Sequence, residues 1–185
     1  KQVPLASSVE VAGPSDQDST TLPRFVYSTV DQNNTLLKTM VDAWYMKAND
    51  GTTNALRDAN LLYGPPKYWN LQTQNGVNSF AGLFEGYEGA NHINPQYWSV
   101  NKVLDISNLT KGSDFNNPLE TWVSSHPYVA EDENSTVQMT NMSSAFENNK
   151  AFNQPLNPTW VTSSVTNMEA MFKGATAFHQ PLNAW

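Results

Sequence analysis

Two blocks of this chain occur twice with the same offset, and this repetition constrains the fold more than any other feature of the sequence. FNQPLN at residues 152–157 returns as FHQPLN at 178–183, and MTNMSSAF at 139–146 returns as VTNMEAMF at 165–172, so both blocks are shifted by 26 residues. A unit of this length cannot bury its apolar side chains alone. The repetition therefore predicts a solenoid in which successive units stack on one another.

More diverged copies place one tryptophan in each unit. WSVNKVLDI at 98–106 aligns without a gap to WVTSSVTNM at 160–168, and KGSDFNNPLETW at 111–122 matches the block at 173–185 with one residue missing. The spacing between tryptophans is close to one unit, except where about 12 residues are inserted within 124–136. We predict that these tryptophans are buried core anchors of the repeat: Trp69, Trp98, Trp122, Trp160 and Trp185.

Within one unit, apolar spacing predicts the local structure. Val165, Met168 and Phe172 are three or four residues apart, which indicates a short helical turn that Gly174 ends. Residues 160–165 are the better candidate for a short parallel strand. The asparagines that recur in the repeat are expected to hydrogen-bond the backbone of turns between coils: Asn141, Asn153, Asn157, Asn167 and Asn183.

Two helices are predicted ahead of the repeats. Residues 33–49 carry apolar side chains at i, i+3 and i+4 spacing, among them Leu37, Val41 and Trp44, and so form one apolar stripe. A second short helix is predicted over 52–62, because the two prolines that follow it cannot continue a helix.

The chain is thus expected to divide into an extended N-terminal arm over 1–32, a helical cap over 33–68, and a solenoid of about four repeats of 24–38 residues over 69–185. We expect the array to continue beyond residue 185, because solenoids need a polar terminal cap; stacking of this end on another subunit is the alternative. The arm is interpreted as a flexible linker or as a strand docked on another element. The residues expected at an interface are Val3, Leu5, Val9, Val11, Leu182 and Trp185.

The composition excludes several classes of function. Charged residues make up only 15% of the chain and the net charge is −7, which argues against a nucleic-acid partner and against docking on an anionic membrane. No apolar run approaches the roughly 20 residues that span a bilayer. The chain has no cysteine, so disulfides, thiolate nucleophiles and cysteine-ligated metals are excluded.

No residue pattern predicts catalysis or a bound metal. His92, His126 and His179 match no metal-ligand spacing, and there is no nucleophile elbow or nucleotide-binding loop. The acidic run at 131–134 is interpreted as a solvated loop, with a weak calcium site as the alternative. We therefore predict a protein that is not an enzyme, with no catalytic residue, no metal site and no cofactor.

Two features of the sequence are compatible with an extracellular protein, one through glycosylation and the other through glycan binding. Four asparagines lie in sequons that allow N-glycosylation, although their number is no more than chance would produce: Asn33, Asn108, Asn134 and Asn141. The Gly- and Asn-rich loop at 85–94 and its surroundings carry tyrosines that we expect to be exposed and able to stack on a glycan: Tyr63, Tyr68, Tyr87 and Tyr97.

The run F-N-Q-P-L-N-x-x-W-x-x-S-x-V-T-N-M-x-x-M-F, which starts at Phe152, is similar to the 26-residue repeat of BspA-type, leucine-rich-repeat-like surface proteins of bacteria and algae. The helix at 33–49 and the Tyr-Gly-Pro-x-x-x-Trp that starts at Tyr63 resemble the segment that opens such arrays. The resemblance covers residues 33–185, but the family's Trp-Asp pair is absent after every tryptophan.

The resemblance implies an α/β fold, a leucine-rich-repeat-like solenoid of short strands and short helices with a helical N-terminal cap. It also implies a non-enzymatic protein of the cell surface or the extracellular space. Such a protein would act in adhesion, or as a subunit of a filament or other surface assembly, through contacts with its own copies or with neighbouring surface proteins. Glycan binding through exposed tyrosines is the alternative function.

Overall fold

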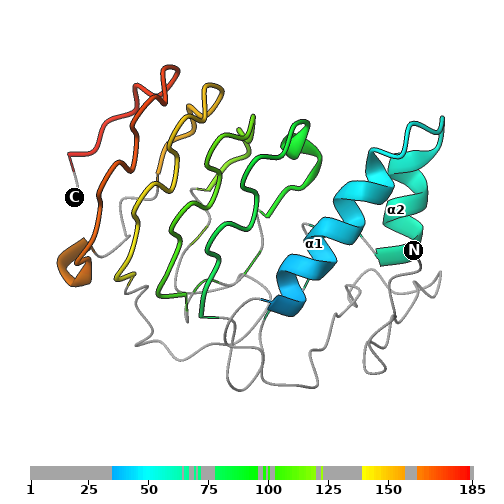
Figure 1. Cartoon of the computed structure of the whole chain (residues 1–185), viewed down its shortest axis with the longest axis horizontal. Coiled ribbons are helices and arrows are strands. Elements are labelled where there is room, and N and C mark those ends of the chain that lie inside the picture. Colours follow the sequence, from blue (N-terminus) through cyan, green and yellow to red (C-terminus); the bar gives the residue numbers. More distant parts are fainter. Residues whose placement is uncertain are drawn as a thin grey trace.

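The computed structural model describes two α-helices, two 3-10 helices and a series of parallel segments that lie side by side (Figure 1). The helices are α1 (Thr35–Ala48), α2 (Ala55–Tyr63), η2 (Ala90–His92) and η3 (Thr162–Ser164). The described residues are 35–63, 65–66, 69, 71, 78–95, 98, 100, 103–119, 122, 139–156 and 162–183. The predicted arm at 1–32, with Val3, Leu5, Val9 and Val11, lies outside them.

Helices α1 and α2 confirm the two helices predicted from apolar spacing, and they pack against each other. Leu37, Val41 and Trp44 are fully buried because they share the face of α1 that meets the core. Of the described helices, neither α1 nor α2 has the length and apolar character needed to cross a membrane.

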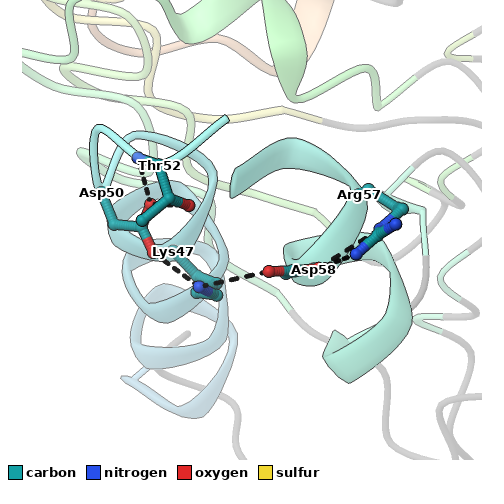
Figure 2. A network of polar contacts seen from close by, with 5 residues as sticks. All are labelled: Lys47, Asp50, Thr52, Arg57 and Asp58. Carbon is teal, nitrogen blue, oxygen red and sulfur yellow. Dashed lines mark hydrogen bonds and ion pairs between the residues drawn. The ribbon is translucent and has the colours of Figure 1, made fainter. Parts of the chain in front are cut away.

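A surface network of ion pairs joins the end of α1 to α2 (Figure 2). Lys47 Nζ lies 2.5 Å from Asp50 Oδ2 and 3.8 Å from Asp58 Oδ2, and Asp50 accepts hydrogen bonds from Thr52. Bonding to Lys47, and then to Thr52, lowers the pKa of Asp50 to about 2. Arg57 extends the network to Asp58. Exposed pairs of this kind contribute little stability, and here they link the end of α1 to α2 across the turn between the helices.

Four stretches of chain follow the helices and run parallel to one another; we call them segment 1 (78–95), segment 2 (103–119), segment 3 (139–156) and segment 4 (162–183). Isolated parallel bridges join Ser79 to Asp105, Asp105 to Asn141, and Asn141 to Asn167. No longer strand occurs in the part of the chain that the structure describes. The strand predicted over 160–165 is wrong for its described residues, because Thr162–Ser164 form η3 and Val165 donates its N–H back to Thr162.

The backbone between segments uses every second N–H group. In segments 1, 2 and 3, four alternate N–H groups donate to carbonyl oxygens of the next segment at 2.7–3.0 Å; the donors are Phe80, Gly82, Phe84 and Gly86, then Ile106, Asn108, Thr110 and Gly112, then Met142, Ser144, Phe146 and Asn148. Of the three N–H groups between them in each segment, the first bonds to a side-chain oxygen two residues earlier, and the other two bond to the carbonyl three residues earlier. Each segment is thus a run of turns whose alternate peptide groups form a ladder.

The helical turn predicted over 165–172 is also wrong. Residues 169–174 form successive turns, and Ala170 and Gly174 have φ angles of 56° and 72°, which a right-handed helix does not contain. Positive φ recurs at the same two positions in all four segments; the earlier pairs are Gly82 and Gly86, Asn108 and Gly112, and Ser144 and Asn148. Left-handed residues four apart turn alternate N–H groups outward to the neighbouring segment.

Aromatic side chains fill the space between the segments. Trp69, Trp98 and Trp122 are buried as expected, and the rings of Trp69 and Trp98 stack at 5.9 Å. The indole N–H groups of Trp98 and Trp122 donate to the carbonyls of Pro66 and Pro95. Phenylalanines continue the stack through segments 1 to 4: Phe84, Phe115, Phe146, Phe152, Phe172 and Phe178. The core is therefore a continuous column of rings.

Candidate interaction surface

A ladder of asparagines crosses the four segments at one repeat position. The Oδ1 atoms of Asn91, Asn116 and Asn153 each accept the backbone N–H of the residue at the equivalent position in the next segment, at 2.6, 2.9 and 3.1 Å. The last acceptor contact is with His179, whose side chain replaces asparagine in segment 4. This arrangement explains why asparagine follows phenylalanine in the repeat: its amide oxygen bonds one segment to the next, as expected for Asn153.

In segments 2, 3 and 4, the residue after this position bonds in the opposite direction along the stack. The side-chain amides of Asn117, Gln154 and Gln180 donate to oxygen atoms of the preceding segment at 2.9–3.2 Å. In segments 2 and 3, these two adjacent side chains therefore bond their segment to the segment before it and to the segment after it. Side chains that serve this bonding are not free to bind a ligand.

A second group of short polar residues stabilises the turn at each bridge. Ser79, Asp105, Asn141 and Asn167 accept, through a side-chain oxygen, the backbone N–H two residues later at 2.8–3.2 Å. This is the local bonding that Asx and Ser/Thr turns use. Asn141 and Asn167 therefore bond within their own turns, and the prediction that they bond between coils is wrong.

Alternating charges occupy one equivalent position in the four segments, and we call them the charge row: Glu85, Lys111, Glu147 and Lys173. Glu147 Oε2 lies 2.9 Å from Lys111 Nζ, and Glu147 Oε1 lies 3.3 Å from Lys173 Nζ. The Glu147 side chain is only 10% exposed, whereas Lys173 is 72% exposed. Bonding to Lys111, Ser144 and Lys173 lowers the pKa of Glu147 from 4.5 to about 2, and the same contact with Glu147 raises the pKa of Lys111.

We expect the stability of the wild-type protein to fall as the pH drops from about 4.5 to about 2, and to fall less in Glu147→Gln. The unfolded chain binds a proton at Glu147 near pH 4.5, while the folded chain resists protonation down to about 2. The stabilisation is therefore complete above this window and is lost within it. Thermal unfolding followed by circular dichroism across the window measures the difference.

Asp50→Asn is the matched control, because Asp50 has an equally low pKa but lies between the helices, away from the charge row. Each variant should remove only the part of the loss of stability at low pH that comes from its own carboxylate. Parallel melting curves for the wild type and Glu147→Gln over the whole window would contradict the assignment.

The loop expected to carry binding residues is held in place by the second segment. The Asp114 carboxylate accepts the N–H groups of Gly89 and Ala90, both at 2.8 Å, and the Asn91 side chain also bonds segment 2. The expectation that Tyr87 is exposed is wrong: it is 9% exposed, its ring stacks on Tyr45 at 4.1 Å, and its hydroxyl bonds Asp42 and Lys38 of α1. The loop thus anchors α1 to segment 1.

The remaining predicted site residues fall into two groups. Asn108, Asn141 and Leu182 are half-buried, and Leu182 packs against the core. The side chains or backbone of the others lie outside the described residues: Asn33, Asn134, Trp160, Trp185, Tyr63, Tyr68, Tyr97, His126 and the acidic run at 131–134. Their predicted roles stay predictions.

The described side chains of the segments are engaged mainly in hydrogen bonds, ion pairs and ring contacts. Over the described ranges, no three His, Asp or Glu side chains are grouped so as to hold a metal ion. The charge row was missed in the sequence, although applying the 26-residue register to charges as well as to apolar residues would have found it. The segments combine a regular backbone ladder with a row of paired charges.

A known family matches the chain over two consecutive stretches. The model of the family described as "Mycoplasma protein of unknown function, DUF285" matches residues 26–133 and again residues 132–185. The junction of the two matches falls within the insertion at 124–136. Neither the curated proteins nor the solved structures include one that matches this chain.

Proposed function

This chain belongs to the DUF285 family, whose function is unknown, and we propose that it is a leucine-rich-repeat-like solenoid that acts through protein–protein contacts. In this proposal it works at the cell surface or outside the cell, in adhesion or as a subunit of a surface assembly. It needs no cofactor, metal or catalytic residue for that role.

One observation carries the proposal: the same contacts recur at equivalent positions of successive segments. A bridge residue, a self-bonded turn, two left-handed residues and four outward N–H groups occur in the same order in segments 1, 2 and 3. Repeat arrays of this kind present extended, regular surfaces and commonly bind other proteins along them. The similarity of the repeat to BspA-type surface proteins supports the same role.

Antibody labelling tests the location. Cells that naturally make the protein should label as strongly when intact as after permeabilisation, and mass spectrometry of the four sequons should show which asparagines carry glycans. Labelling that requires permeabilisation would contradict a surface role.

Crosslinking tests the mode of action. A membrane-impermeant, lysine-reactive crosslinker applied to intact cells should join the protein to other protein chains, its own copies included. Binding of the purified chain to a glycan array, with no protein neighbour captured, would favour the glycan-binding alternative instead.

A further inference from the structure

Asp50 is followed by a glycine in the exposed turn that joins α1 to α2. An aspartate before glycine is a place where a peptide chain rearranges readily, because glycine has no side chain to shield its backbone nitrogen. Gly51 has a φ angle of 77°, and a Cβ atom placed on it would meet no atom within 4 Å. Its N–H group donates to no described residue. The nitrogen that would react is therefore uncovered.

The rearrangement joins the Gly51 nitrogen to the side-chain carboxyl carbon of Asp50. As this N–C bond forms, a C–O bond of the carboxyl group breaks, and the proton of the nitrogen leaves with the hydroxyl group as water. Solvent water then opens the cyclic imide at either carbonyl. Opening at the side-chain carbonyl restores aspartate, whereas opening at the backbone carbonyl leaves Gly51 joined through the side-chain carbon as isoaspartate. No oxidant, reductant or enzyme is needed.

The carboxyl group must be protonated to react at a useful rate, because a carboxylate is a poor electrophile. Three contacts oppose its protonation: Lys47 Nζ lies 2.5 Å from Oδ2, and Oδ1 accepts the N–H and the hydroxyl of Thr52 at 2.9 and 2.7 Å. Contacts of this kind favour the charged form. They lower the pKa of Asp50 from 3.8 to about 2, with Lys47 as the largest cause. The carboxyl group therefore stays ionised in weak acid.

The charged groups around Asp50 come from both helices (Figure 2). Lys47 belongs to α1 and also lies 3.8 Å from Asp58 of α2, and Asp58 pairs in turn with Arg57. Lys47 thus has two carboxylate partners but lies much closer to Asp50. The two contacts of Lys47 can be removed one at a time, because each depends on a different carboxylate.

We propose that Asp50–Gly51 is a site of spontaneous isomerisation to isoaspartate, and that Lys47 is the positioning residue that keeps it unreacted in the folded protein. The inference does not depend on the proposed function. Isoaspartate adds a methylene group to the backbone and moves the carboxylate to the α-carbon, away from Lys47 and Thr52. The modified turn therefore loses its link to the end of α1.

Ageing of the full chain near pH 5 tests the proposal. Lys47→Met, an exposed change that should leave the fold intact, is expected to form isoaspartate about tenfold faster than the wild type. The reason is that the protonated fraction of the carboxyl group rises tenfold for each pH unit by which its pKa rises. Chromatographic peptide mapping locates the product, because trypsin releases the pair within residues 48–57 of the wild type and 39–57 of Lys47→Met.

Two matched variants separate the effect of Lys47 on Asp50 from a loosening of the helix pair. Asp58→Asn removes the contact of Lys47 with α2 but keeps its contact with Asp50, so the rate should stay at the wild-type level. Lys47→Arg keeps the positive charge and should also react slowly. The wild-type chain unfolded in guanidinium chloride gives the rate without tertiary contacts, and it should react faster than the folded wild type.

Three outcomes would overturn the proposal. Equal rates for the wild type and Lys47→Met would remove the role of Lys47. An Asp58→Asn variant that reacts as fast as Lys47→Met would assign the protection to helix packing instead. Equal rates for the folded and the unfolded wild type would show that the turn gives Asp50 no protection.

Discussion

Trp98→Ala should lower the free energy of unfolding by about 3–5 kcal/mol. The ring is 2% exposed, stacks on Trp69, and meets Phe80 edge to face, so truncation leaves a large cavity in the column of rings. The variant also removes one of the two donors to the buried carbonyl of Pro66, which keeps only the backbone N–H of Trp69. Urea unfolding followed by circular dichroism measures the loss.

Conservative variants separate the packing from the hydrogen bond. Trp98→Phe keeps most of the ring but removes the donor to Pro66, whereas Trp44→Phe removes an indole N–H that has no hydrogen-bond partner among the described residues. Trp98→Phe should therefore cost more than Trp44→Phe. Leu61→Ala, at a site 72% exposed, should change stability by less than about 0.5 kcal/mol. A loss below about 1 kcal/mol for Trp98→Ala would contradict its place in the core.

Asn149→Ala should cost about 3 kcal/mol, because it leaves several buried polar groups without partners. The Asn149 side chain is fully buried and donates to Thr110 Oγ1 and to the carbonyl of Phe115, while its oxygen accepts the N–H groups of Ala151 and Phe152. Calorimetric or urea unfolding of the variant gives the value.

The repeat itself suggests the compensating change. Thr110 stands where segments 1, 3 and 4 have phenylalanine, and Asn149 fills the space that this smaller residue leaves. In the following pair of segments, Phe146 and Ala175 occupy the equivalent positions. The double variant Thr110→Phe/Asn149→Ala should therefore be more stable than the sum of its single variants indicates. Additive losses would show that the two positions are not coupled.

The two helices and the buried tryptophans could be predicted from the sequence. The helices follow from the local spacing of apolar residues, and the tryptophans recur once in each repeat. Apolar residues at helical spacing place Leu37, Val41 and Trp44 on one face whatever α1 packs against. A tryptophan that recurs in a repeated unit with few charges is expected to be buried in the core. The 26-residue register likewise follows from two blocks read along the chain.

The backbone conformation of each turn could not be predicted from the local pattern of side chains. Val165, Met168 and Phe172 have helical spacing, yet the segment forms turns with Ala170 at positive φ. A local pattern reports which side chains are apolar, whereas the choice between helix and turns depends on what accepts the N–H groups. Here segments that lie one repeat away in sequence supply those acceptors.

The sequence by itself determined the helices before the repeats, the length of the unit and the residues that form its core, because each depends on the order of side chains along the chain. The tertiary structure decided which groups meet: Tyr87 with Tyr45, Asn149 with Thr110, and Glu147 between two lysines. These contacts join residues 26 to 42 positions apart, so they exist only once the segments stack in one register. Hydrogen bonds form only at about 3 Å and attraction between exposed charges is screened beyond about 10 Å, and only the folded chain brings these groups that close.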